Sequence, residues 1–259
     1  MSPASAQDGA EAAPTYADLA DLADASTLII HAKIRKQATL KPERAAGLKP
    51  GFARLYVEAN TLGLIGGDAP VGESLRYLVD VPLDGQGKVP RLKKREVLLF
   101  AQDVPGRPGE LKLAGPGAQM MWSEELAAQV RPILTELARP DAPTAITGVR
   151  DAISVAGNLA GESESQIFLS TTSGEPASLT IVHRPGMAPQ WGVSWSDIVD
   201  QSAAAPQPET LGWYRLACFL PRSLPAQANL SRDGESQRRA AADYQFVVAQ
   251  LGACPRTRN

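Results

Sequence analysis

Residues 27–36 read TLIIHAKIRK, and this stretch decides the class of fold. It begins as a continuous apolar run and then alternates apolar with basic residues, which is typical of a β-strand that leaves a core and enters solvent. Three more segments with a strand pattern follow at 52–60, 73–81 and 95–101, separated by turns that contain Gly or Pro. Strands of this length predict a small barrel or a curled antiparallel sheet.

A short helix is expected before the first strand, because Thr15 is a candidate N-cap and Asp18 completes a capping box. The segments ADASTLIIHAKIRK, GFARLYVEANTLGLIGG, GESLRYLVDV and KREVLLFAQ follow it in an order that resembles the oligonucleotide/oligosaccharide-binding (OB) fold of exported netrin-like modules and tissue inhibitors of metalloproteases. The resemblance covers about residues 16–112 and implies an OB-like barrel. Those inhibitors place a cysteine at the mature N-terminus to bind the protease zinc. This chain has no cysteine before Cys218, so that inhibitory activity is not expected.

The whole chain also resembles a group of uncharacterised exported bacterial proteins, through the segments GESLRYLVDVPLD, ITGVRDAISVAGNLAGE and WYRLACFLPRSLP. This resemblance implies export and carries no activity with it. Residues 1–7 (MSPASAQ) contain a small-x-small cleavage pattern but no apolar segment before it, so they are either the remnant of an export signal or a flexible Ala-rich tail. We expect a periplasmic or secreted protein with a disordered tail over residues 1–14.

The composition changes along the chain. All eight lysines lie at or before Lys112, all four tryptophans lie at or after Trp122, and the net charge changes from basic to acidic between these halves. We therefore expect an OB-like module over residues 15–112 and a second module over residues 113–259. The predicted fold class is α+β with a mostly antiparallel sheet, in which an OB-like N-terminal barrel is followed by a β-meander with flanking helices.

In the second module the patterns predict a first helix at 123–137, strands at 145–156, 166–172, 177–184 and 190–195, and two last helices at 209–218 and 235–251. Antiparallel packing of the last two helices would bring Cys218 close to Cys254. In an exported protein this pair is expected to form a disulfide. The alternative is a pair of free or buried thiols.

The overall composition excludes several classes of protein. The 259 residues carry a net charge of −2, which is too balanced for the electrostatic footprint of a nucleic-acid-binding protein. No apolar run approaches the roughly 18 residues of a membrane-spanning helix. Metal-binding motifs and Gly-rich phosphate loops are also absent from the sequence, so we expect no metal, no other cofactor, no nucleic acid and no transmembrane segment.

Two surface features are candidate binding sites. The run KVPRLKKR at 88–95 gathers its basic residues before an apolar strand, and it would either meet an anionic surface or form a solvated loop that protects a sheet edge. Trp191 and Trp195 alternate along one strand, so they would either stack on a sugar or an apolar peptide, or pack in the core. The candidate binding residues are Arg91, Lys93, Lys94, Arg95, Trp191 and Trp195.

His183 is a candidate catalytic base because it follows a strand and would meet Ser194 and Asp197 across a predicted hairpin. No G-x-S-x-G turn, which would expose a nucleophilic serine, surrounds these residues. The sequence therefore favours an exported, non-catalytic protein that binds a partner protein or an anionic component of the cell envelope. The alternative is a hydrolase that acts on an envelope polymer with His183 as general base. The sequence indicates no particular oligomeric state.

Overall fold

The computed structural model describes residues 13–67, 69–196 and 204–258. The chain divides into two compact units, residues 1–135 together with 256–259, and residues 136–255. The predicted disordered tail over residues 1–14 lies, up to residue 12, outside the described residues. The described elements are four α-helices, two short 3-10 helices and ten strands, so the prediction of an α+β fold is confirmed.

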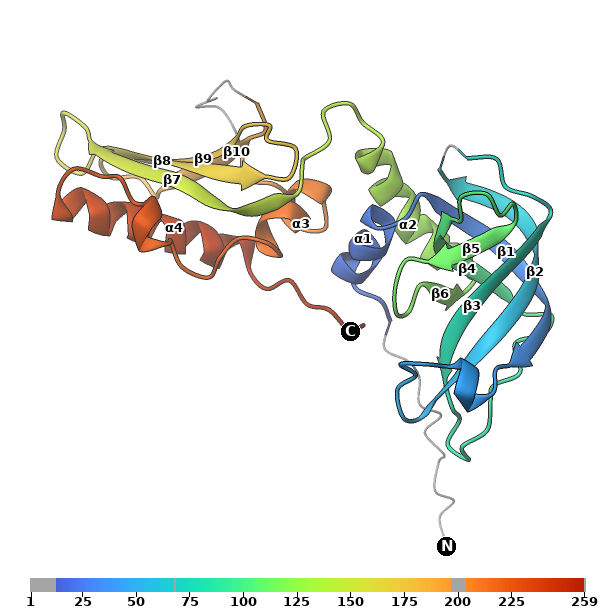
Figure 1. The fold of residues 1–259 in the computed structure, drawn as a ribbon. Coiled ribbons are helices and arrows are strands. Elements are labelled where there is room, and N and C mark those ends of the chain that lie inside the picture. Colours follow the sequence, from blue (N-terminus) through green and yellow to red (C-terminus); the bar gives the residue numbers. More distant parts are fainter. Residues whose placement is uncertain (1–12, 68, 197–203, 259) are drawn as a thin grey trace, which may run out of the picture. The chain divides into compact units, whose positions relative to one another are not determined.

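The first unit is built around one curled sheet (Figure 1). Its elements are α1 (Tyr16–Asp24), β1 (Leu28–Thr39), η1 (Pro42–Arg44), β2 (Phe52–Gly66), β3 (Ser74–Pro82), β4 (Glu96–Asp103), β5 (Glu110–Leu113), β6 (Gln119–Met121) and α2 (Glu124–Leu137). The strand order is β1-β2-β3-β5-β4-β6, and an additional β1–β4 pairing closes β1 to β5 into a barrel. The β3–β5 pair is parallel, and the other strand pairs are antiparallel.

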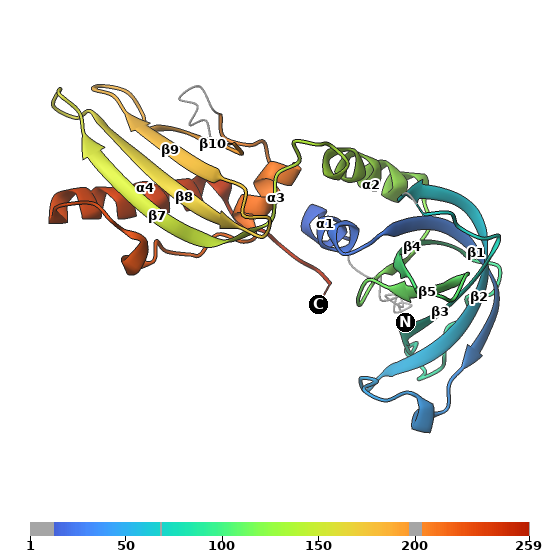
Figure 2. The same ribbon diagram turned by 45° about the horizontal axis from the view of Figure 1, so that its top comes forward.

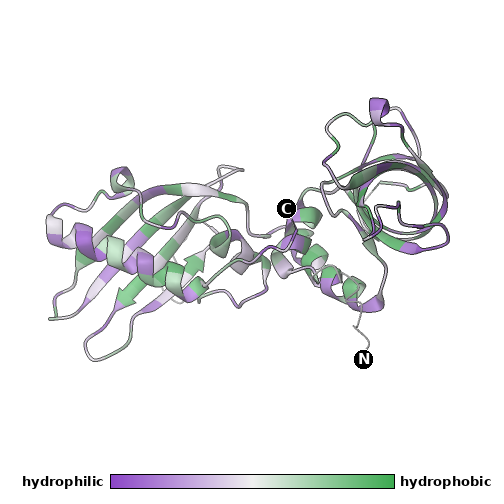
Figure 3. Cartoon of the chain, turned by 90° about the horizontal axis from the view of Figure 1, so that it is seen from below, coloured by the Kyte–Doolittle hydropathy of each residue, from purple (hydrophilic) through white to green (hydrophobic). Residues whose placement is uncertain are grey.

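This closed five-stranded barrel is compatible with the OB-like fold expected from the sequence. Its interior forms because alternate residues of each strand point inward, as β3 illustrates: Leu75, Tyr77, Val79 and Val81 are buried, whereas the residues between them are exposed. In Figure 3, which looks down the barrel, hydrophobic and hydrophilic residues follow one another along the strands. The barrel core is a single cluster of buried apolar side chains contributed by all five strands.

The two units divide at residues 135/136 rather than at the boundary of 112/113 that the composition suggested. The reason is that β6 pairs with β4 at residues 97–99, so the chain is still adding to the barrel after the last lysine. The helix α2 follows at once, with Ser123 Oγ accepting a hydrogen bond from Leu126 N at 3.1 Å. The predicted capping box of α1 is also present, with Thr15 Oγ1 accepting from Asp18 N at 3.1 Å.

The second unit is a four-stranded antiparallel meander with helices (Figure 2). Its elements are β7 (Ile146–Ala156), β8 (Ser163–Thr171), β9 (Ala177–His183), β10 (Gln190–Ser194), α3 (Leu211–Ala217), η2 (Ala226–Ala228) and α4 (Gly234–Leu251). The strand order is β10-β9-β8-β7, as expected for a meander. The helix α4 runs along one face of the sheet and packs against β7 and β8 (Figure 1).

The predicted disulfide is present between Cys218 and Cys254, whose Cα atoms are 5.2 Å apart. Cys218 is the C-cap of α3, and Cys254 lies shortly after the end of α4. Two hydrogen bonds support the same region. Trp213 Nε1 donates to Leu251 O at 2.9 Å, and the Tyr244 hydroxyl donates to Pro221 O at 2.6 Å. The disulfide therefore joins two segments that the packing already holds together.

Candidate ligand-binding cavity in the barrel

The barrel wall contains a division, which is a gap between β3 and the edge of β4 that pairs with β5 and β6. On that edge β5 pairs with residues 101–103 and β6 pairs with residues 97–99, so the two short strands follow one another with a Gly-containing loop between them. The β3–β5 ladder contains only Arg76 and Tyr77 of β3. Beyond Tyr77, residues 78–82 pair with β2 alone, and β6 pairs with β4 alone.

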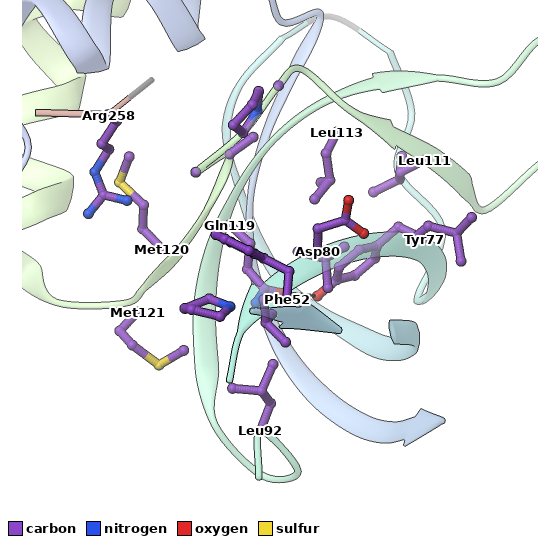
Figure 4. Close-up of a pocket in the computed structure, with 18 of the residues that line it drawn as sticks. Phe52, Tyr77, Asp80, Leu92, Leu111, Leu113, Gln119, Met120, Met121 and Arg258 are labelled. Atoms are coloured by element: carbon purple, nitrogen blue, oxygen red, sulfur yellow. Dashed lines mark hydrogen bonds between the residues drawn. The ribbon is translucent and has the colours of Figure 1, made fainter. Parts of the chain in front are cut away.

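An open cavity of about 1490 Å³ occupies this division, with its walls on β2, β3, β5, β6 and α2 (Figure 4). Apolar side chains of the barrel interior form the inner wall, among them Val79, Leu92, Leu111 and Leu113. Across the cavity the Tyr77 hydroxyl donates to Gln119 Oε1 at 2.7 Å. Burial raises the pKa of the Tyr77 phenol, so this hydroxyl stays protonated as a donor. The cavity therefore opens part of the barrel core to the surface.

Four large apolar side chains around the cavity are also exposed on the outer surface, where such residues are usually scattered singly. They are between 37% and 47% exposed: Phe52, Tyr56, Leu78 and Met121. Two of them are neighbours on the outer face of the barrel, since Tyr56 of β2 is directly opposite Leu78 of β3. Together with the inner wall they make a continuous apolar surface from the barrel interior to solvent.

The charges around the cavity are unbalanced in favour of bases. Lys49, Arg76 and Lys112 are exposed cavity residues, and none of them makes an ion pair with any residue that the structure describes. Three acids line the cavity. Asp80 is bound by Arg54 through two hydrogen bonds of 2.6 and 2.7 Å, Glu110 pairs with Arg107 at 3.3 Å, and Glu125 is hydrogen-bonded at the start of α2. A site with an apolar floor and uncompensated bases at its rim favours an apolar group that carries negative charge.

The predicted basic loop lies beside this cavity. Leu92 of the loop is buried and lines the cavity, and Gln37 of β1 holds it by accepting from the Leu92 amide at 2.6 Å. The loop also covers the edge of β1 beyond the β1–β4 ladder, through hydrogen bonds of Ile34 with the backbone of residues 94 and 95. The four basic side chains of the loop are exposed and make no ion pair within the described part of the chain: Arg91, Lys93, Lys94 and Arg95.

The C-terminal residues of the chain return to α1 and end at the cavity. Asp18 Oδ1 and Oδ2 accept hydrogen bonds from the Thr257 backbone and side chain, and Asp21 binds the Arg256 guanidinium at 2.6 and 3.0 Å. Arg258, the next residue, lines the cavity (Figure 4). Asp18 thus holds the C-terminal residues in place along one wall of the cavity.

We expect replacement of Asp18 by Asn to destabilise the first unit in a pH-dependent way. Burial alone would raise the pKa of Asp18, but the hydrogen bonds from Thr15 and Thr257 outweigh it and hold the pKa at about 2. Because this value is below that of an unfolded aspartate, the ionised carboxylate contributes about 2 kcal/mol above pH 4, and the contribution is lost as the pH falls towards 2. Urea unfolding of the wild type and Asp18→Asn from pH 7 to pH 2 tests this. A difference between them that is constant over this range would contradict it.

Trp191 and Trp195 belong to the second unit and are half-buried. Trp191 is opposite Ile181, which is fully buried, and Ile181 in turn is opposite Ser165 on the face that contacts α4. Trp191 therefore points to the helix side of the sheet, on the outermost strand β10. The indole of Trp195 lies near Gly212 of α3. Neither side chain forms an open platform, and neither is as deeply buried as a core position.

The structure does not bring His183 to Ser194. In the β9–β10 ladder Ser194 is opposite Ser178, five residues from His183, which is a separation of about 16 Å along the strand. Asp197 lies outside the described residues. The expected meeting across the hairpin is therefore wrong for His183 and Ser194, because they lie at opposite ends of β9.

His183 binds Asp243 of α4 instead, with its Nε2 2.6 Å from Asp243 Oδ1. The other oxygen of Asp243 accepts from Ser165 Oγ at 2.5 Å. The carboxylate is therefore the central group of this buried set, and the imidazole is not in position to take a proton from the serine. Sequence reasoning missed Asp243, although its place in α4 beside buried Ala240, Tyr244 and Val247 marks it as a polar residue on an apolar face.

Among the described residues no three His, Cys, Asp or Glu side chains gather in a way that could hold a metal ion. No helix in the described ranges is long and apolar enough to cross a membrane.

The chain was also compared with known proteins. No protein-family model matches it, and no curated protein matches it.

Proposed function

We propose that this protein is a non-catalytic binding protein, and that its barrel cavity takes an apolar, negatively charged group of a partner protein or of a cell-envelope component. The observation that carries the proposal is the combination of an apolar cavity with exposed bases at its rim that make no ion pair among the described residues, of which Lys49 and Lys112 are examples. The four exposed bases of the loop at 91–95 extend this positive region, because buried Leu92 ties that loop to the cavity. We also propose that the protein is exported to the periplasm or secreted. The disulfide supports this, because such bonds persist in oxidising compartments.

The proposal is tested with 8-anilinonaphthalene-1-sulfonate, an apolar anion whose fluorescence rises in apolar sites. We expect saturable binding to the native full-length chain. Replacement of Met121 by Glu should weaken binding about tenfold, because it adds a negative charge at the mouth of the cavity. The matched control is Leu64→Glu, since both side chains are 43% exposed in the first unit but Leu64 does not line the cavity. Equal loss in both variants, or no saturable binding to the wild type, would contradict the proposal.

The basic loop should contribute through long-range electrostatics. We expect a variant with Glu at positions 91, 93, 94 and 95 to bind the same dye about threefold more weakly at low ionic strength, with Leu92 left in place to keep the loop anchored. The difference should disappear near 1 M salt, where the Debye length is about 3 Å. If the variant and the wild type bind equally at low salt, the loop has no part in the site.

A further inference from the structure

The division of the barrel wall lies where one more strand would pair with both β3 and β6. We infer that the group taken into the cavity is an extended peptide segment of a partner protein, which adds as a β-strand between β3 and β6. This inference rests on the proposed function and names the class of ligand for the same cavity.

The free edge of β3 presents backbone groups to the cavity. In the β2–β3 ladder, the Leu83 amide donates to Gly51 O and the Thr61 amide donates to Glu73 O, so the odd-numbered residues of β3 are bonded to β2. The even-numbered residues point the other way, and Arg76 N accordingly donates to Gly109 O before β5. Because the β5 pairing stops at Tyr77, the N–H and C=O of Asp80 point into the division with no strand opposite them in the described structure.

The inner edge of β6 also presents backbone groups that have no strand opposite them in the described structure. The Phe100 amide donates to Ala118 O and the Trp122 amide donates to Glu96 O, so the even-numbered residues around β6 are bonded to β4. By the alternation of an antiparallel ladder, the backbone groups of Gln119 and Met121 point away from β4. These two residues line the same cavity as Asp80. The cavity is therefore bounded by two strand edges that each have unused donors and acceptors.

The directions of the two edges are compatible with one inserted strand. β3 is parallel to β5, and β5 and β6 are both antiparallel to β4, so β3 and β6 run in the same direction. An added strand therefore runs antiparallel to both or parallel to both. The antiparallel orientation is favoured because its hydrogen bonds are slightly more stable per residue. Such an insertion would complete the sheet where the ladder now stops.

The unused backbone groups distinguish a peptide from an acyl chain. A hydrocarbon in the cavity would cover the Asp80 and Met121 amides without bonding them, and burial of a polar group without a hydrogen-bond partner is unfavourable. A peptide strand bonds the same groups with its own backbone, which is the basis of recognition by strand addition. The side chains of the strand would alternate between the apolar inner wall and the basic rim. We therefore expect a peptide in which apolar residues alternate with acidic ones.

The test begins with selection of linear peptides of about eight residues from a random phage-displayed library, using the full-length protein. The affinity of a selected peptide is then compared for Asp80→Pro and Asp80→Asn. Both variants lose the carboxylate that binds Arg54, but only the proline removes the N–H that points into the cavity. Pro82 already occupies the next outward-pointing position of β3, so this edge accommodates proline. Thermal unfolding verifies that both variants are folded.

We expect the peptide to bind Asp80→Pro about tenfold more weakly than Asp80→Asn. N-methylation of either alternate set of peptide residues should weaken binding strongly, because one set bonds β3 and the other bonds β6, whereas a peptide held by its side chains alone would lose little in either. Loss with one set only would contradict insertion between the two edges. Equal affinity for the two variants, or insensitivity to both sets of N-methyl groups, overturns strand addition. If dodecanoate but no selected peptide displaces the bound dye, the ligand is an acyl chain, and the proposed function stands while this inference fails. If the wild type binds neither dye nor peptide, the proposed function itself fails.

Discussion

Replacement of Cys218 and Cys254 by serine is expected to lower the free energy of unfolding of the second unit by about 4 kcal/mol. The bond joins positions 36 residues apart, so its loss releases a long loop in the unfolded chain. Three of the four tryptophans, Trp191, Trp195 and Trp213, lie in this unit, so urea unfolding followed by tryptophan fluorescence mainly reports on it.

The control is the wild type in the presence of a reducing agent, which should unfold at the same urea concentration as the double variant. Hydrogen bonds such as Trp213 Nε1 to Leu251 O would remain in both, so we expect a folded but weaker unit rather than an unfolded one. A double variant whose unfolding midpoint equals that of the oxidised wild type would show that the bond contributes nothing to stability.

Replacement of His183 by alanine should cost about 3 kcal/mol in the same unit. The Asp243 side chain is only 4% exposed, and without the imidazole its carboxylate keeps Ser165 as its other side-chain partner. The cost arises mainly from removing one of the two side-chain hydrogen bonds that satisfy a buried carboxylate. The imidazole is 29% exposed, so water replaces part of this interaction and keeps the expected value near ~3 kcal/mol rather than higher.

A second substitution separates this cause from simple loss of packing. Asp243→Asn removes the charge and keeps an oxygen that can accept from Ser165 Oγ. The double variant His183→Ala/Asp243→Asn should therefore be less destabilised than the sum of the two single variants. Additive losses in equilibrium unfolding would show that the two side chains are not coupled and would contradict the account of this pair.

The long elements of the fold could be predicted because their pattern repeats over many residues. The segment at 73–81 mostly alternates polar and apolar residues, with Leu78 as the exception, and β3 buries every second residue of it. The meander and the disulfide were also predictable, the latter because only one pairing of Cys218 and Cys254 exists. β5 and β6 were not predicted, since four and three residues beside glycines and prolines carry no periodic signal.

The cavity could not be predicted for the same reason. It exists because the β3–β5 ladder stops at Tyr77 while β6 continues along β4, and the end point of a ladder depends on register rather than on residue type. The exposed bases of the loop were visible in the sequence, but their link to the barrel depends on the burial of Leu92. His183 was correctly singled out as a polar residue at a strand end, yet its partner lies 60 residues away on α4.

The divided wall between β3 and β6 is the proposed binding site. Amide hydrogen exchange of the full-length chain, with and without a saturating selected peptide, tests it most directly. The account predicts slower exchange in residues 78–82 and 119–121, with the Asp80 amide among the protected groups. Protection confined to residues 136–255, or exchange in both strand edges that the peptide leaves unchanged, would contradict it.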